Sequence, residues 1–115
     1  MERRELGERC YAVGLRTVRL SKDLPTDSIF KIISNQLIRS ATSVGANYFE
    51  ARAASSRREF KRFLEISLRS TNETVYWIRL LTDCDLKDNE PWQKLKEECC
   101  EVAKMLAAAV IKLKI

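Results

Sequence analysis

The sequence predicts an all-α protein, a single domain over residues 1–115 folded as an antiparallel, up-down-up-down four-helix bundle. Its 115 residues suffice for one hydrophobic core but not for two. It has three glycines and two prolines, and a sandwich or barrel of this length needs many more tight turns. Four segments carry apolar residues at the three- and four-residue spacing of amphipathic helices, and short polar connections join them.

The first predicted helix runs from Glu2 to about Lys22. It ends before Pro25, because proline disfavours helical geometry in the residue that precedes it. Gly7 and Gly14 each cost about 1 kcal/mol relative to alanine, and we interpret them as points where a neighbouring helix comes close. The apolar stripe of this helix is Leu6, Cys10, Val13, Thr17 and Leu20.

The second predicted helix begins at a side-chain cap, either Thr26 or Asp27, and ends near Ala53. Gly45 lies inside it and is a candidate for a bend. Its apolar stripe is Ile33, Leu37, Ala41, Val44, Tyr48 and Ala51.

The third predicted helix starts at a Ser-x-x-Glu capping box, in which the Glu59 carboxylate is expected to accept a hydrogen bond from the cap amide of Ser56. The polar loop 83–89 is short, so the fourth helix returns antiparallel with Pro91 in its first turn. The third stripe is Phe60, Phe63, Leu64, Ser67, Thr71, Thr74, Ile78 and Leu81. The fourth is Trp92, Leu95, Cys99, Val102, Ala103, Leu106, Val110 and Leu113. A helical hairpin that completes its core only on oligomerising is the open alternative.

Composition argues against catalysis. The chain has no histidine, which removes the commonest general base, every serine–histidine or cysteine–histidine pair and the Glu-x-x-His ligands of di-iron bundles. It also has no glycine-rich phosphate loop. We therefore expect no enzymatic activity and no cofactor.

The cysteines and the hydropathy pattern suggest a cytoplasmic protein. The four cysteines form no Cys-x-x-Cys pair, so we expect reduced, mostly structural thiols and no metal site. The amino terminus mixes charges of both signs without an apolar run behind it, which is unlike a signal peptide. No stretch of about 20 apolar residues occurs, so we expect no membrane span.

Two stretches of the chain resemble a known family. The first reads QLIRSATSV at 36–44 and NYFE at 47–50; the second reads SRREFKRFLEIS at 56–67, followed by Ser70 and Glu73. They are similar to the four-helix-bundle proteins encoded within intervening sequences of bacterial 23S ribosomal RNA genes. That family's pattern is roughly QLRRAA-SI, then NIAEG, then S--EF-RFL-IA, then a serine followed by a glutamate. Here Tyr48 and Phe49 replace Ile-Ala, and Ala51 replaces the glycine, which leaves the geometry of the following turn open.

The resemblance implies a four-helix bundle that assembles into a ring-like homo-oligomer, often a pentamer, with no established enzymatic activity. More distantly, the chain resembles the accessory variability proteins of diversity-generating retroelements, which bind nucleic acid and a reverse transcriptase. Extending that role to this chain is an analogy, because one fold hosts many functions.

A polar row on the second helix is the first candidate site. Its members are Gln36, Arg39, Ser43, Asn47 and Glu50, within an arc of about 80° beside the apolar stripe. We expect Glu73 to reach across to this row from the third helix. Three interpretations stay open: an ordinary solvated or helix–helix boundary, a structural or subunit polar network, and a small-molecule site.

A basic face on the third helix is the second candidate site. Residues 55–82 hold six basic and three acidic side chains, against six and seven in residues 83–115. Five of the cations span about 140° of the helix opposite its apolar stripe, with only Glu65 interrupting them, a pattern that favours phosphate contact; they are Arg57, Arg58, Lys61, Arg62 and Arg69. No aromatic residue interleaves them to stack on bases. The alternative is a solvated face that pairs with Glu59, Glu65 or the acidic 83–101 region.

The breadth of apolar sequence on the third helix predicts self-association, since exposed apolar patches mark interfaces. The residues concerned are Ile66, Leu68, Val75, Trp77 and Leu80, with Ile111 and Ile115 from the fourth helix. Together these features predict an oligomeric scaffold that binds nucleic acid, with structured RNA as the first candidate. The main alternative is a protein–protein adaptor in which the basic charge has no such role.

Overall fold

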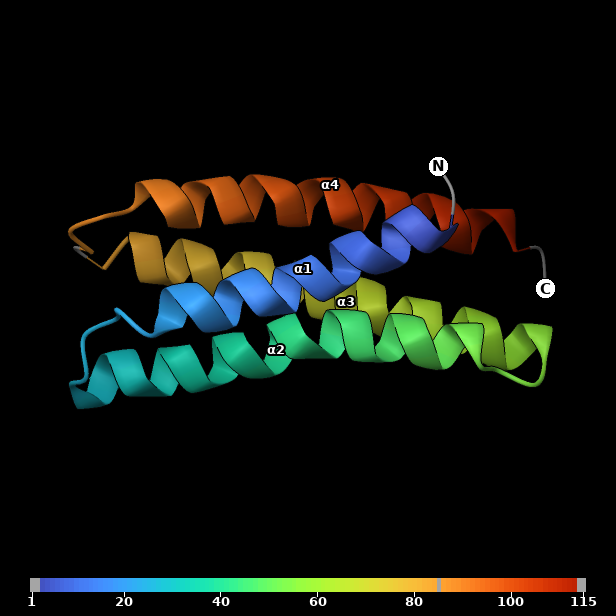
Figure 1. Cartoon of the computed structure of the whole chain (residues 1–115), viewed down its shortest axis with the longest axis horizontal. Coiled ribbons are helices and arrows are strands. Elements are labelled where there is room, and N and C mark those ends of the chain that lie inside the picture. The colour runs from blue at the N-terminus through green and yellow to red at the C-terminus, as the bar shows by residue number, and fades with distance from the viewer. Residues whose placement is uncertain (1–2, 85, 114–115) are drawn as a thin grey trace.

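The computed structural model describes residues 3–84 and 86–113, and that part of the chain forms four helices without a strand. They are α1 (Arg3–Ser21), α2 (Ser28–Arg52), α3 (Arg57–Thr82) and α4 (Glu90–Lys112). Short connections alternate between the two ends of a bundle measuring 45 × 23 × 19 Å, so consecutive helices run in opposite directions (Figure 1). The predicted fold is confirmed. The expected helix start at Glu2 and the apolar Ile115 lie outside the described residues.

Each helix packs against two neighbours. α2 and α4 each lie beside both α1 and α3, whereas no Cα atoms of α1 and α3 come within 8 Å of each other over the described residues. α1 and α3 are therefore diagonally opposed, and their outward faces point to opposite sides of the bundle. Since all four helices of one chain build the core, the alternative of an open helical hairpin is wrong.

The core follows the predicted apolar stripes. The largest side chains that are almost fully enclosed come from α2, α3 and α4; they are Leu37, Leu64, Ile78, Leu81, Leu95 and Leu106. The fully enclosed side chains of α1 are smaller. Six stripe positions are only half-buried, namely Leu20, Phe60, Phe63, Ala103, Val110 and Leu113. All but Ala103 lie near an end of the bundle, where neighbouring helices cover less of each side chain.

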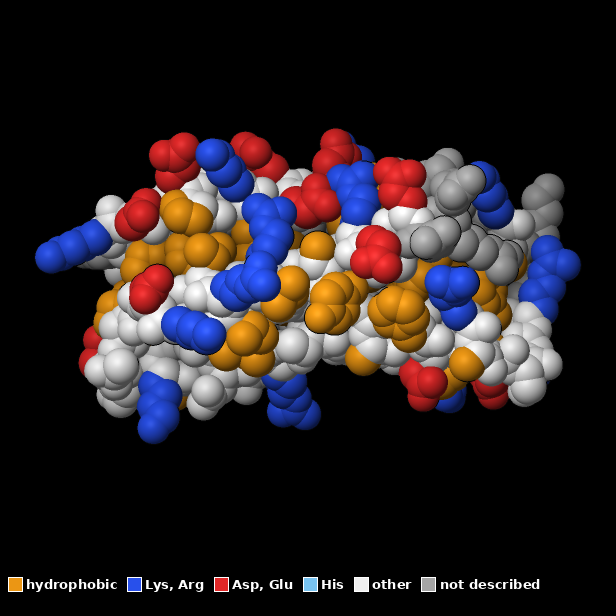
Figure 2. Space-filling view, viewed as in Figure 1, with side chains coloured by type: hydrophobic (Ala, Val, Ile, Leu, Met, Phe, Trp, Pro, Cys, Tyr) orange, Lys and Arg blue, Asp and Glu red, His pale blue; other side chains and the backbone are white. Residues whose placement is uncertain are grey.

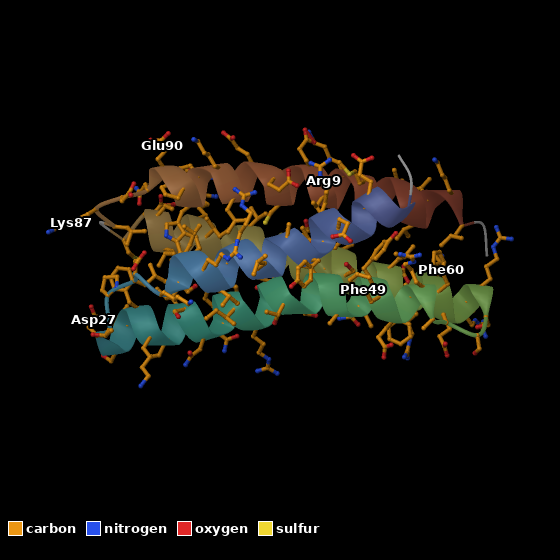
Figure 3. The ribbon with its side chains drawn as sticks, in the orientation of Figure 1. Arg9, Asp27, Phe49, Phe60, Lys87 and Glu90 are labelled. Carbon is orange, nitrogen blue, oxygen red and sulfur yellow. The ribbon has the colours of Figure 1, made fainter. Side chains whose placement is uncertain are left out.

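Side-chain caps fix where α2 and α3 begin. Of the two candidates for α2, Asp27 is the cap: its carboxylate accepts from the amides of Ile29 and Phe30, both at 3.1 Å (Figure 3). At α3 the Ser56 hydroxyl accepts from the amide of Glu59 at 3.1 Å. The Glu59 carboxylate accepts from the amide of Ser55 at 3.1 Å, one residue before the expected cap amide. The sequence therefore predicted where both helices begin.

Glycines bring α1 and α2 into backbone contact. A Cβ atom on Gly45 would lie 3.3 Å from the Cα of Tyr11, and one on Gly14 would lie 3.4 Å from a backbone carbonyl oxygen of α2. A Cβ on Gly7 would lie 3.1 Å from the Tyr48 ring. The close approach predicted for the α1 glycines is therefore present. Gly45 serves the same contact, and α2 stays helical through it.

One bidentate ion pair joins α1 to α4. The Arg9 guanidinium donates from Nε to Oε2 of Glu98 at 2.8 Å and from Nη2 to Oε1 at 2.7 Å. In Figure 3, Arg9 lies between these two helices. The side chains are 27% and 23% exposed, so water screens the pair only in part. The hydrogen bond from Arg9 is the largest influence on Glu98 and lowers the pKa of its carboxyl group, with burial opposing.

We expect Glu98→Gln to lower the free energy of unfolding by about 1 kcal/mol at neutral pH, because it removes a bidentate charged partner. The carboxyl pKa is lower in the folded than in the unfolded chain, so this stabilisation is complete above about pH 4.3, the usual glutamate value. It is lost as the pH falls through the folded pKa. Urea unfolding of both proteins across acidic pH should therefore show the difference shrinking towards zero.

The matched control is Glu97→Gln, which neutralises an exposed carboxylate one position away. It should leave stability nearly unchanged at every pH. A deficit of the Glu98 variant that is the same in acid as at neutral pH would contradict the assignment.

No described helix is both long enough and apolar enough to cross a lipid bilayer.

Candidate nucleic-acid interface and the contact that orients it

The basic face of α3 comprises Arg57, Arg58, Lys61, Arg62 and Arg69. The four arginines are exposed and Lys61 is half-buried. The buried positions of the same helix, which include Leu64, Ser67 and Thr71, occupy the opposite side of its circumference. The basic face begins at the end of the bundle where Phe60 is labelled in Figure 3. The predicted outward orientation of these cations is therefore observed.

The cations of the basic face form no ion pair within the described part of the chain. Within the described ranges, no carboxylate oxygen lies within 4.0 Å of its five cations; the ion pairs there involve Arg9, Arg79, Lys94 and Lys104. The alternative predicted ion pairs of these cations with Glu59, Glu65 or the acidic 83–101 region, and no such pair is observed among the described residues. A local contact is also present, with the Arg62 guanidinium carbon 5.3 Å from the centroid of the Phe63 ring.

The opposite side of the bundle has a different charge pattern. Figure 2 views the molecule from the α1 side and shows acidic and basic side chains intermixed, with hydrophobic side chains between them. A shallow hollow of about 580 Å³ there is lined by residues of both signs, among them Arg16, Lys94, Glu97 and Glu101. Mixed charges bind polyanions poorly, so α3 carries the distinctive surface.

Hydroxyl groups form the contact between α2 and α3. The Ser40 and Thr74 hydroxyl oxygens are 2.9 Å apart, as are those of Ser43 and Ser70. The Ser67 hydroxyl donates to the backbone carbonyl of α2 at residue 44, at 2.7 Å. These small side chains let the two helices approach and give each buried hydroxyl a partner. They also fix the rotation of α3 about its axis, and with it the direction of the basic face.

The predicted polar row divides into two parts. Asn47 donates to the backbone oxygen and the hydroxyl of Ser43 on its own helix, at 2.9 and 2.8 Å, and Ser43 in turn meets Ser70 of α3. Gln36 is half-buried, and Arg39 and Glu50 are exposed. The row is therefore a helix–helix boundary with a structural polar network at its centre. A small-molecule site is disfavoured, because Ser43 and Asn47 are already bonded to protein.

Glu73 does not make the predicted reach across to α2. Among the described residues its bond is on its own helix, where a carboxylate oxygen accepts from the Trp77 indole nitrogen at 2.9 Å. Trp77 lies one turn away, so this contact needs no second helix.

Sequence reasoning missed Ser40 and Ser70, which complete the α2–α3 contact, and counted Ser67 and Thr74 only as small members of an apolar stripe. A signal was present: the α3 stripe carries Ser67, Thr71 and Thr74 where a core normally has larger apolar residues.

The cysteines are divided between core and surface. Cys10 and Cys99 are fully enclosed, and burial raises the pKa of each thiol to about 12, so both stay protonated at neutral pH. Cys84 is half-buried and Cys100 is exposed, and all four are free thiols. No group of three or more metal-ligating side chains occurs in residues 3–84 and 86–113.

The apolar surface is not where the sequence predicted it. Leu68, Val75, Trp77 and Leu80 of α3 are half-buried against the core, and Ile66 is half-buried as well. The exposed large hydrophobic side chains lie mainly on α1 and α2 instead: Tyr11, Val18, Ile29, Ile32 and Phe49, with Tyr76 on α3 and Ile111 on α4. Only the expectation for Ile111 holds among the described residues.

Three of these side chains border an apolar groove between α1 and α2. Tyr11, Val18 and Phe49 rim a hollow of about 380 Å³ whose floor includes Gly14 and Gly45. Phe49 lies beside α1 in Figure 3, and hydrophobic side chains run along this face in Figure 2. The glycines that let the α1 and α2 backbones approach each other lie at the bottom of this groove.

The comparison with protein families agrees with this architecture. The model of the 23S rRNA-intervening sequence protein family matches residues 4–108. The chain belongs to this family. A solved structure of a family relative, described as a protein of unknown function from the S23 ribosomal protein family of Bacteroides thetaiotaomicron VPI-5482, superposes with a TM-score of 0.87. It is 32% identical, over 96% of this chain and 98% of the relative. A search of curated proteins finds no match.

A double-mutant cycle tests the α2–α3 contact in this family member. Ser43→Ala and Ser70→Ala should each lower the free energy of unfolding by about 1 kcal/mol, because each leaves a hydroxyl without its partner. The double variant should lose less than the sum of the two, since the shared bond is removed once. Urea unfolding of the four proteins gives the coupling energy. Strictly additive losses would mean that the two hydroxyls do not interact.

Proposed function

We propose that the protein is a non-enzymatic, oligomeric helical-bundle scaffold of the cytoplasm, which binds nucleic acid through the basic face of α3, with RNA as the first candidate. The observation that carries this proposal is the set of five outward-pointing cations without a carboxylate at ion-pair distance in the described part of the chain. Unpaired cations on one face attract phosphates, and each contact releases a condensed counterion.

The chemistry of the surface supports a backbone-dominated mode of binding. Arginine is the prevailing cation, and its planar guanidinium donates two parallel hydrogen bonds to a phosphate. Contacts of this kind position a nucleic acid without reading its sequence. We therefore expect weak sequence preference and a strong dependence on salt.

The remaining parts of the proposal rest on composition and surface. The absence of histidine supports a binding role over a catalytic one. Free thiols at all four cysteines fit a reducing compartment such as the cytoplasm. The apolar groove between α1 and α2 supports self-association, because it gathers exposed Tyr11, Val18 and Phe49 on one face. In a ring-like oligomer such as a pentamer, the basic face would repeat around the assembly.

The nucleic-acid proposal is tested by replacing Arg57, Arg58, Lys61 and Arg62 together with glutamine. Affinity for an RNA oligonucleotide, measured by fluorescence anisotropy, should fall at least tenfold at low salt. The slope of log affinity against log salt should shrink by about 3, the value for four lost phosphate contacts to a single strand. DNA probes run in parallel report any preference between the two nucleic acids.

A control variant carries the same change in net charge elsewhere. It replaces exposed lysines on the other elements of the protein with glutamine, namely Lys22, Lys31, Lys87 and Lys112. Its affinity should fall much less, by long-range attraction alone. Equal losses in the two variants, or no loss in either, would remove the basic face of α3 from the proposed function.

Self-association is tested by placing charge in the groove. Val18→Lys combined with Phe49→Lys should lower the solution mass measured by light scattering, because burying two ammonium groups in an apolar interface is costly. Ile111→Lys is the control, since its side chain is 76% exposed and lies outside the groove. Thermal unfolding checks that each variant is folded. An unchanged mass for the groove variant would assign assembly to another surface.

The α1–α2 groove also favours the second candidate function, a protein–protein adaptor. A partner bound there would be captured through apolar contacts and would remain bound after nuclease treatment and in high salt. A complex that disappears under nuclease treatment supports nucleic-acid binding instead.

A further inference from the structure

Tyr76 extends the basic face of α3 with an exposed aromatic ring. It lies seven residues beyond Arg69, which places it about 20° from that arginine on the helix circumference, at 100° per residue. Its side chain is 58% exposed, the largest exposure of any aromatic side chain on α3. Phe60 and Phe63 lie on the apolar side of α3, whereas Tyr76 lies on the same face as the cations.

The Tyr76 ring is held in place by its neighbour. The rings of Tyr76 and Trp77 meet edge to face, with centroids 5.0 Å apart and an interplanar angle of 76°. The Trp77 indole is itself fixed, because its nitrogen donates to the Glu73 carboxylate at 2.9 Å. Trp77 is also packed against the core. An exposed ring with a fixed support loses little freedom when a flat ligand stacks on it.

The shape of the bundle disfavours a duplex as the ligand of this face. The major groove of B-DNA is about 12 Å wide and admits one helix of 10–12 Å diameter. α3 is flanked on both sides by α2 and α4, so it cannot enter alone. In a duplex the base faces are stacked on one another and are not available to a tyrosine. In an unpaired strand they are available.

We propose that Tyr76 is a base-stacking residue and that the α3 surface from Arg57 to Tyr76 binds an unpaired stretch of nucleic acid. This inference rests on the proposed function and names its ligand more closely. The surface is about 28 Å long at 1.5 Å per residue. Its cations hold the phosphates of the strand, and the tyrosine ring receives the face of one base near the end of the contact. The unpaired stretch belongs equally to a single strand or to the loop of a folded RNA.

The experiment compares three probes of equal phosphate number: an unstructured oligonucleotide, the same backbone lacking its bases, and a blunt duplex. Wild-type protein should bind the complete strand more tightly than the abasic strand. Tyr76→Ala should weaken binding of the complete strand about 5- to 100-fold, the range measured for single stacking contacts. It should leave affinity for the abasic strand and the salt dependence unchanged. Tyr76→Phe, which keeps the ring, should behave as wild type.

The controls separate this inference from the proposed function. Ile32→Ala removes an exposed apolar side chain, 64% exposed, from α2 outside the α1–α2 groove and should not discriminate between the probes. Equal affinity of wild type for complete and abasic strands, with dependence on the α3 arginines retained, overturns the stacking role alone. If Tyr76→Ala lowers the affinity for the complete and the abasic strand equally, the stacking role is overturned as well, because such a loss indicates a structural effect. If affinity does not change when the arginines of the basic face are replaced, the proposed function and this inference are overturned together.

Discussion

Hydroxyl pairing between α2 and α3 is the interaction on which the position of the basic face depends. Because Ser40 meets Thr74 and Ser43 meets Ser70, α3 has one rotation about its axis that satisfies both pairs. That rotation turns Leu64 and Thr71 inward and Arg58 outward. A contact made of leucine alone would tolerate small rotations, since apolar packing has no direction. Directional bonds between small side chains therefore specify which surface α3 presents.

The outward face of α3 differs from the other faces of the bundle in its charge pattern. On the other faces some cations pair with carboxylates, as Lys94 does with Glu90 at 3.4 Å, so that the two charges partly cancel. On α3 the cations of the basic face have no such partners in the described part of the chain, and an aromatic ring follows them. A folded protein gains nothing from leaving like charges adjacent on one face. In the proposed function, a ligand that carries several negative charges offsets this repulsion.

Much of the fold was predictable from the sequence, because burial repeats with the period of the helix. The caps at Asp27 and Ser56 and the direction of the basic face follow from the same local rules. The predictions that were wrong concerned side chains whose surroundings depend on neighbouring residues and helices. Glu73 was assigned a partner on another helix, although Trp77 one turn away was nearer. The apolar surface was assigned to α3, but α2 and α4 half-cover its flanks, and the groove arises at an α1–α2 crossing that no single segment specifies.

The bidentate pair between Arg9 and Glu98 joins residues 89 positions apart in the chain. During synthesis at about 5–20 residues per second, Arg9 emerges several seconds before its partner exists. Through that interval α1, α2 and α3 are available to pair with one another, but α1 and α3 both lack α4, which completes the packing of each. Translation order therefore leaves the apolar stripe of the first helix partly uncovered until the last helix has been made, and during that time the stripe remains accessible to chaperones.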